Sequence, residues 1–173
     1  CHMNEGHAAF LILERACSFM KENKIPFEAA LAVTRAGNLF TTHTAVAAGF
    51  DHFSPSIMWK FFGKNAKNEL QIDFVNMIAH GRLDPFDTSE SFNMAYLAIH
   101  GSGAVNGVSR LHGKVSKNLF SVLFPRQPIC EIPIGSVTNG VHMPSWDGTF
   151  ADKLWTDAWG KSRMKGELKT LEG

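Results

Sequence analysis

The sequence has little of what marks secreted, membrane or nucleic-acid-binding proteins. Its three cysteines, Cys1, Cys17 and Cys130, are an odd number at scattered positions, which fits neither a disulfide framework nor paired zinc ligands. Seventeen Lys and Arg residues face sixteen Asp and Glu residues without long runs of one sign, so no basic patch suits nucleic acid or an anionic membrane. No apolar run approaches the roughly 20 residues that span a bilayer, and no signal peptide is visible. We therefore expect a cytoplasmic protein with reduced thiols and a small or uncharged ligand.

The chain does have enough apolar residues to bury a sizeable core. It is 173 residues long and 45% hydrophobic, and this length favours one globular domain. The first residue is Cys1 rather than Met, and polar residues follow at once. This start leads us to expect a fragment of a longer chain.

Apolar spacing predicts helices that alternate with short strands. Asn4 is a candidate N-cap for the first helix, and Gly63 and Gly81 are candidate C-terminal residues. The expected helices are 5–23, 27–35, 56–63, 68–81, 91–103, 110–124 and 149–160, and the expected strands are 38–43, 104–109 and 132–141. This alternation predicts an open α/β sheet of a few short, mainly parallel strands, with a ligand crevice at their carboxyl ends.

The first seven residues gather Cys1, His2, Glu5 and His7, which raises the question of a metal site. On a helix at about 100° per residue, Glu5 and His7 would point roughly 200° apart and could not close on one ion. Local pattern alone favours capping by Asn4 and Glu5 and a partly buried, hydrogen-bonded His7. We therefore predict no metal site.

Two other polar positions lie near strand ends. His43 follows an expected strand, where it could contact a ligand or be an ordinary loop histidine. Asn139 follows another, either in a simple turn or as an amide that donates to and accepts from a sugar hydroxyl. The glycines of 101–113 match neither a dinucleotide loop nor a P-loop, so we interpret them as allowing close backbone packing.

Four motifs in order resemble the glycogen and α-glucan phosphorylase family, especially its shorter bacterial and archaeal branch. They are MNEGHAAF (3–10), FTTHTAVAAGFDHF (40–53), NMAYLAIHGSGAVNGVSRLHGKVS (93–116) and IPIGSVTNGVHMPSW (132–146), and together they cover nearly the whole chain. The resemblance implies a glycosyltransferase that moves the terminal α-1,4-linked glucosyl unit of a glucan to phosphate and gives glucose 1-phosphate. It implies a two-domain GT-B enzyme with Rossmann-like domains, of which 1–148 would be the C-terminal part of the first domain and 149–173 a helical segment leading to the second.

The resemblance also implies residue roles. His43 matches the catalytic-loop histidine that contacts the reacting glucosyl unit, partly through its main-chain carbonyl, and Asn139 matches an asparagine that binds the same sugar. Glu5 and His7 match residues on the acceptor-glucan side, where they would orient hydroxyls. Glu5 replaces an aspartate of the longer animal-type enzymes and Gly103 replaces a histidine, so those two contacts are not carried over unchanged.

The implied cofactor is pyridoxal 5′-phosphate, whose Schiff-base lysine and phosphate-binding residues match no stretch of this sequence. Lys114 follows a Gly-rich run but falls in a helical region, and we expect it to be solvated. The expected partners are an α-1,4-glucan, phosphate or glucose 1-phosphate, and the missing C-terminal domain, while homo-oligomerisation stays open. Two other functions also stay open: a sugar-nucleotide-dependent GT-B glycosyltransferase and a non-catalytic glucan-binding module.

Overall fold

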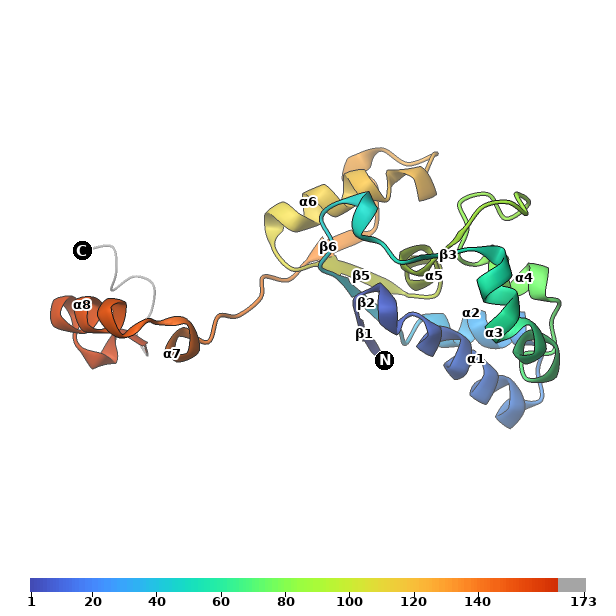
Figure 1. Ribbon diagram of the computed structural model, residues 1–173, viewed down its shortest axis with the longest axis horizontal. Helices are drawn as coiled ribbons and strands as arrows, with labels where there is room; N and C mark the ends of the chain where they lie inside the picture. The colour runs from blue at the N-terminus through green and yellow to red at the C-terminus, as the bar shows by residue number, and fades with distance from the viewer. Residues whose placement is uncertain (165–173) are drawn as a thin grey trace. The chain divides into compact units, whose positions relative to one another are not determined.

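The computed structural model describes residues 1–164, which form two compact units (Figure 1). The first unit comprises Cys1–Thr138 and holds the sheet, and the second begins at Asn139. The predicted boundary at residue 148 concerns the two domains of the whole enzyme rather than these compact units, and it stays a prediction. No helix among the described residues is long and apolar enough to cross a membrane.

A four-stranded parallel sheet forms the centre of the first unit, as predicted. Its strands are β1 (His2–Asn4), β2 (Leu39–Thr42), β5 (Ala104–Gly107) and β6 (Ile134–Ser136), in the order β1-β2-β5-β6. Asn4 pairs with Thr41, and Thr41 pairs with Asn106, so the carboxyl ends of β1, β2 and β5 meet at one edge. A second, antiparallel pair is formed by β3 (His52–Phe53) and β4 (Phe92–Asn93).

Helices surround this sheet because their apolar stripes need a partner surface. The α-helices of the first unit are α1 (Phe10–Asn23), α2 (Phe27–Arg35), α3 (Pro55–Asn68), α4 (Phe74–Ala79), α5 (Met94–His100) and α6 (Arg110–Leu119), and the 3₁₀ turns are η1 (Gly6–Ala8), η2 (Ala47–Gly49), η3 (Ser121–Leu123) and η4 (Ile129–Glu131). Helix α1 packs against α2 and α5, and α6 packs against β5 and β6.

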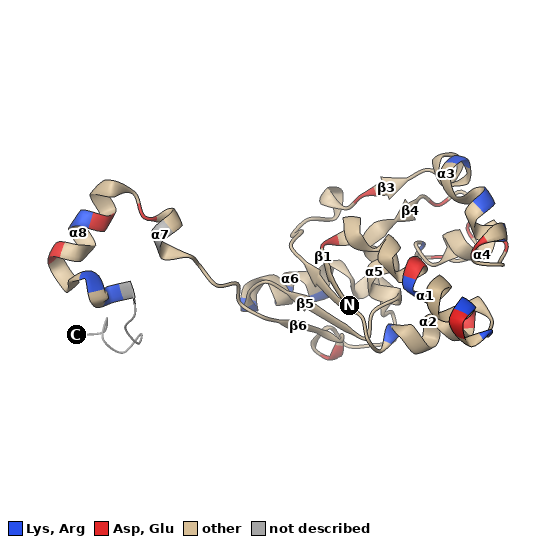
Figure 2. Cartoon of the chain, turned by 90° about the horizontal axis from the view of Figure 1, so that it is seen from below, with Lys and Arg blue, Asp and Glu red and all other residues tan. Residues whose placement is uncertain are grey.

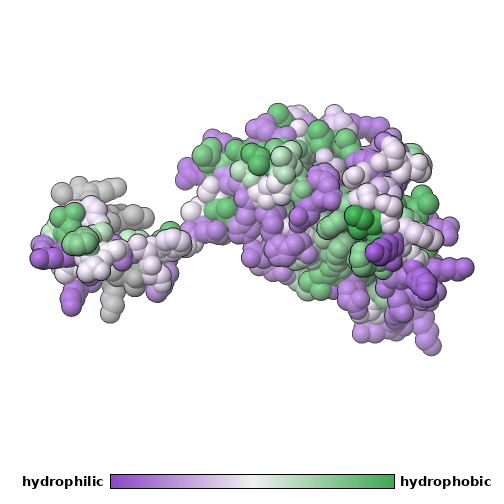
Figure 3. Space-filling model, viewed as in Figure 1, coloured by the Kyte–Doolittle hydropathy of each residue, from purple (hydrophilic) through white to green (hydrophobic). Residues whose placement is uncertain are grey.

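The core is continuous through the first unit. Its largest fully buried apolar side chains include Phe27, Phe40, Phe92 and Phe120. Outside this core, the face seen in Figure 3 mixes apolar and polar residues. This core fits the sequence-based expectation of a chain able to bury a sizeable core, although it belongs to the first of two compact units.

Several details of the chain differ from the prediction. Residues 92–93, expected at the start of a helix, form β4, and the helix expected over 110–124 ends at Leu119, before the separate turn η3. The first helix begins at Phe10 rather than Glu5, because residues 2–4 form a strand and Gly6–Ala8 form a 3₁₀ turn. Helix α3 continues through Gly63 to Asn68, and Gly63 lies beneath the ring of Trp59, which a Cβ at this position would approach to 2.8 Å. Residues 69–73 are not helical, and Asp73 precedes α4.

The second unit contains α7 (Met143–Trp146), α8 (Thr149–Trp159) and η5 (Lys161–Met164). Helix α8 confirms the predicted helix 149–160. The Arg163 guanidinium donates to Asp147 at 2.6 Å and to Asp152 at 2.7 Å, and the rings of Trp155 and Trp159 stack with centroids 5.0 Å apart. The contact between Arg163 and Asp152 ties η5 to α8, and the contact with Asp147 ties it to the segment before α8.

Candidate functional site

The Glu5 carboxylate organises the edge of the sheet where β1 and β2 end. Its Oε2 accepts hydrogen bonds from the main-chain N–H of His43 at 2.7 Å and from the Thr44 hydroxyl at 3.0 Å. Its Oε1 accepts from the N–H of Gly6 at 2.9 Å. Glu5 also has a φ of 77°, a strained conformation for a residue with a side chain. The surrounding contacts hold this residue in place, and it joins the start of η1 to the loop after β2.

The imidazole of His43 is held by the neighbouring strand. Its Nε2 lies 2.6 Å from Oδ1 of Asn4, and because an amide oxygen only accepts, the imidazole donates. The His43 side chain is otherwise exposed. The ring therefore has a defined orientation at the open edge of the sheet and remains accessible to a ligand.

His112, on α6, holds the same loop from the other side. Its Nδ1 accepts from the N–H of Val108 at 3.3 Å, so the ring proton is on Nε2. That Nε2 donates to the main-chain carbonyl of Thr44 at 3.1 Å. His112 is 9% exposed, and its own N–H donates to the Ser109 hydroxyl that caps α6.

Two glycines let α6 come this close to the sheet. A Cβ on Gly107 would lie 2.7 Å from Nδ1 of His112 and 2.9 Å from the main-chain nitrogen of Gly113. A Cβ on Gly113 would lie 2.9 Å from Cβ of Ser136 and 3.0 Å from the carbonyl oxygen of Gly135. The interpretation of these glycines as sites of close backbone packing is confirmed.

A row of polar groups crosses the sheet below this edge. The Thr41 hydroxyl donates to Oδ1 of Asn106 at 3.0 Å, so it accepts from Nε2 of His2 at 2.7 Å. The Asn106 amide in turn donates to the Gly107 carbonyl at 3.2 Å. Hydrogen bonds between side chains thus link β1, β2 and β5.

The loop after β2 is held by hydrogen bonds on both sides, yet the main-chain carbonyl of His43 has no hydrogen-bond partner among the described residues. Glu5 binds the N–H of His43, and His112 binds the carbonyl of Thr44. Within residues 1–164, no hydrogen bond reaches the main-chain carbonyl of His43 between them. Chemically, this edge offers a preorganised carbonyl, an imidazole and amides, which suit a hydroxyl-bearing ligand. The described residues contain no group of three potential metal ligands.

The four site residues predicted from the sequence, Glu5, His7, His43 and Asn139, do not all lie together in the structure. The structure brings Glu5 and His43 together. His7 is exposed on η1 and makes no hydrogen bond among the described residues, so the expectation of a partly buried, bonded histidine is wrong. Asn139 is exposed and opens the second unit, so its convergence with His43 stays a prediction.

Sequence reasoning missed three residues of this edge. Asn4, predicted as a helix cap, instead accepts from His43, while Glu5 caps η1. Thr44 and His112 were not selected. For His112 a signal existed, because a histidine on the buried side of an amphipathic helix needs partners for both ring nitrogens.

Comparison with known proteins identifies the family. The family model described as carbohydrate phosphorylase matches residues 1–155. The chain belongs to the carbohydrate phosphorylase family. It is 39% identical over 152 residues to a glycogen phosphorylase of Mycobacterium tuberculosis, a match that covers 84% of this chain and 17% of that protein. It is 39% identical over 145 residues to a maltodextrin phosphorylase of Thermococcus litoralis, covering 84% and 16%, and 30% identical over 161 residues to a glycogen phosphorylase of Aquifex aeolicus, covering 93% and 22%.

The chain spans 16% to 22% of the length of these relatives. Its resemblance to the family, first seen in four motifs, is confirmed. The motif residues Glu5, His43 and His112 all contribute to the described edge of the sheet, although they are 107 residues apart at most along the chain. The family match therefore falls on residues that the fold brings together.

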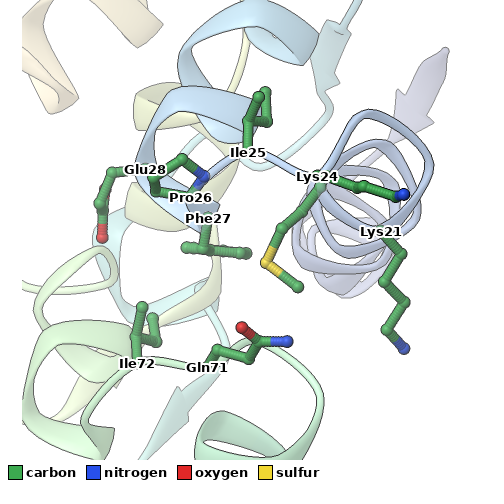
Figure 4. Close-up of a pocket in the computed structure, with 9 residues that line it drawn as sticks. Lys21, Lys24, Ile25, Pro26, Phe27, Glu28, Gln71 and Ile72 are labelled. Atoms are coloured by element: carbon green, nitrogen blue, oxygen red, sulfur yellow. The ribbon is translucent and has the colours of Figure 1, made fainter.

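A hollow elsewhere on the first unit is separate from the edge. A cavity of about 660 Å³ lies between the end of α1, the start of α2 and the segment at Gln71 and Ile72 (Figure 4). Since a helix rises about 1.5 Å per residue, the 14 residues of α1 put roughly 20 Å between its start, which follows η1, and the end that borders this cavity. Apolar groups of Ile25 and Phe27 form part of the lining, with Lys21 and Lys24 on the α1 side.

The described residues do not fit pyridoxal phosphate, the cofactor implied by the resemblance. An imine-forming lysine needs a sheltered amine beside a phosphate site. Lys114 is exposed, as expected, and the other described lysines are exposed too, except Lys117. Lys117 is half-buried and donates to the Cys130 carbonyl at 2.7 Å. No chemical step is therefore derived through this group.

Proposed function

We propose that this chain supplies the glucosyl-binding edge of an α-glucan phosphorylase. The reaction is transfer of the terminal α-1,4-linked glucosyl unit of glycogen, starch or maltodextrin to phosphate, giving glucose 1-phosphate. One observation carries the proposal. The Glu5 carboxylate binds the N–H of His43, while the His43 carbonyl stays free at the carboxyl edge of a parallel sheet. Membership of the carbohydrate phosphorylase family supports the same reaction.

The residues of this chain would act mainly through fixed dipoles. Glycosyl transfer passes through an oxocarbenium-like state in which positive charge develops on the sugar ring. A carbonyl oxygen that is already oriented stabilises such charge without reorganisation, and the His43 carbonyl is held in this way by contacts on either side. The His43 imidazole, oriented by Asn4, would bind a sugar hydroxyl. Glu5 acts in this proposal as a positioning residue.

The remaining elements of the proposal lie beyond this edge. Asn139 would bind the same sugar, and the exposed His7 would meet the acceptor glucan. The parallel sheet with its helices would be part of a Rossmann-like domain in a two-domain GT-B enzyme, with residues 1–148 in the first domain. Pyridoxal phosphate would be held by a second domain, so residues 1–173 assayed alone should show no turnover.

The proposal is tested by assaying glucose 1-phosphate formation from maltooligosaccharide and inorganic phosphate. The longest polypeptide that the gene encodes should be active, and the 173-residue chain alone should not. In the active polypeptide, His43→Ala should lower kcat by about tenfold to a hundredfold, because misplacement of a reacting group has effects of this size. His52→Ala is the matched control, since His52 is exposed on β3 and its ring makes no hydrogen bond in residues 1–164.

The competing functions give different results. Glycosyl transfer that requires a sugar nucleotide and does not depend on phosphate would contradict this proposal and favour a sugar-nucleotide-dependent glycosyltransferase. Saturable binding of maltooligosaccharide without turnover by the longest polypeptide would favour a glucan-binding module. Full activity of His43→Ala would contradict the role of His43.

A further inference from the structure

Thr44 follows His43 directly, and three of its groups are held by different parts of the fold. Its hydroxyl donates to Oε2 of Glu5 at 3.0 Å, the same oxygen that accepts from the His43 N–H. Its carbonyl accepts from Nε2 of His112 at 3.1 Å. Its methyl group faces Gly49, where a Cβ would lie only 2.9 Å from Cγ2 of Thr44. Thr44 is thus in contact with the end of β1, with α6 and with the far end of its own loop.

The peptide unit between His43 and Thr44 has no such support of its own. Neither the His43 carbonyl nor the Thr44 N–H makes a hydrogen bond among the described residues. The segment 43–50 also contains no Asp, Glu, Lys or Arg, so it has no ion pair to hold it (Figure 2). Because a peptide unit is planar, its orientation depends on the two rotations beside it, ψ of His43 and φ of Thr44.

The Thr44 side chain restricts these rotations because it is branched at Cβ. A branched side chain has few accessible χ1 angles, so its hydroxyl and methyl group leave Cβ in set directions. With Oγ1 bound to Glu5 and Cγ2 against Gly49, the Cα–Cβ bond of Thr44 is held in one direction. The bond from His112 holds the carbonyl on the other side of the residue. The φ of Thr44, and with it the direction of the His43 carbonyl, follows from these contacts.

The surface that meets the Thr44 methyl group is also held in place. Gly49 ends η2, and the ring of the next residue, Phe50, stacks on Phe120 with centroids 5.1 Å apart. Phe120 is fully buried at the C-cap of α6. Since His112 lies on the same helix, α6 supports the loop at both of its ends.

We propose that Thr44 is a positioning residue for glycosyl transfer, and that its hydroxyl and its methyl group together orient the His43 carbonyl. The inference rests on the proposed function, in which this carbonyl faces the positive charge that develops on the sugar ring. Thr44 acts through His43 and touches no reacting atom in this scheme. Loss of either group lets the peptide unit rotate, so the carbonyl must be reoriented as the charge develops. The defect belongs to the transition state, and kcat should fall with little change in KM.

Two substitutions separate the two groups of Thr44. Thr44→Val keeps the shape and removes the hydroxyl, whereas Thr44→Ser keeps the hydroxyl and removes the methyl group. In the longest polypeptide that the gene encodes, Thr44→Val should lower kcat for glucose 1-phosphate formation by about tenfold to a hundredfold, with KM little changed. Thr44→Ser should lose less, because its bond to Glu5 remains. Thr88→Val is the matched control, since Thr88 is exposed and its hydroxyl makes no hydrogen bond within residues 1–164.

A compensating pair tests the contact between Thr44 and Gly49. Gly49→Ala alone should displace the Thr44 methyl group, because the added Cβ would lie 2.9 Å from it, and should lower kcat. In the double variant Thr44→Ser with Gly49→Ala, one methyl group is removed and another is added on the opposite side of the same contact. The double variant should therefore be more active than Gly49→Ala alone. Gly135→Ala is the matched control, because its added Cβ would lie 3.8 Å from the nearest atom.

Crystal structures of the wild-type and Thr44→Val polypeptides provide a readout that does not depend on catalysis. The peptide unit between His43 and Thr44 should change orientation in Thr44→Val while Glu5 keeps its bond to the His43 N–H. An unmoved peptide unit, wild-type kcat in Thr44→Val, a rise in KM at constant kcat, or a double variant no more active than Gly49→Ala would each overturn the role of Thr44. A wild-type polypeptide that forms no glucose 1-phosphate would instead contradict the proposed function, and a peptide unit that turns in Thr44→Val would then still support Thr44 as the residue that holds it.

Discussion

Glu5 and His43 are 38 positions apart in sequence, yet the Glu5 carboxylate accepts a hydrogen bond of 2.7 Å from the His43 main-chain N–H. The same oxygen accepts from the Thr44 hydroxyl, while His112 binds the Thr44 carbonyl from the opposite side. The peptide between His43 and Thr44 is thus fixed at several points. The His43 carbonyl remains available to a ligand, and its orientation depends on Glu5 and His112.

Glu5→Gln should loosen the His43 loop. The amide can retain only one oxygen, so its NH₂ group would face N–H or O–H donors, and an unmade bond of this kind costs about 1–3 kcal/mol. We expect a fall in kcat of about tenfold or more and a shift of the His43 amide resonance in NMR spectra. Glu22→Gln, at an exposed position on α1, is the control. An unchanged His43 amide signal would show that Glu5 does not position the loop.

His112→Phe should destabilise the fold at α6. The ring volume is largely retained, but the Val108 N–H and the Thr44 carbonyl lose their partner, which should lower the free energy of unfolding by about 1–3 kcal/mol in urea titrations. In the wild-type protein, ¹⁵N NMR should find the His112 proton on Nε2. A proton on Nδ1 would be incompatible with the two hydrogen bonds described.

Gly107→Ala should separate α6 from the sheet. The added Cβ would fall 2.7 Å from the His112 ring and 2.9 Å from the Gly113 backbone, which cannot move as a side chain can. Overpacking of this kind costs about 1–3 kcal/mol, measurable as a lower urea midpoint. Gly135→Ala, on the neighbouring strand β6, is the matched control because its nearest neighbour would be 3.8 Å away. Equal stability of the two variants would contradict this packing.

Stability should fall in acid partly through His100. The His100 ring donates to the His80 carbonyl at 2.8 Å, and desolvation lowers its pKa below the ordinary value of 6.5 although part of the residue is exposed. The unfolded chain therefore binds the proton first as pH falls, so stability is full above pH 6.5 and is lost toward the lower folded pKa. His100→Gln, which does not titrate, should lose less stability than wild type between about pH 7.5 and pH 5.5 in urea unfolding. An identical loss in both proteins would exclude this contribution.

Much of the fold follows from local pattern. Helix α2 occupies the predicted residues 27–35, and strands β2, β5 and β6 lie inside their predicted ranges. Strand β1 was missed because three residues carry too little pattern, and it exists only through pairing with β2. Likewise, the local pattern predicts a helix end at Gly63, but α3 continues past it to Asn68, with Gly63 buried beneath the ring of Trp59.

The sequence by itself determined the α/β class and the family and singled out Glu5 and His43 as candidate residues, because apolar periodicity and ordered motifs are properties of the linear chain. Only the tertiary structure decided that Glu5 binds the His43 backbone, that Asn4 orients its ring and that His112 completes the support. The reason is physical: parallel strands bring together the residues that follow each of them, and which donors meet which acceptors there depends on strand register and on the close approach of α6.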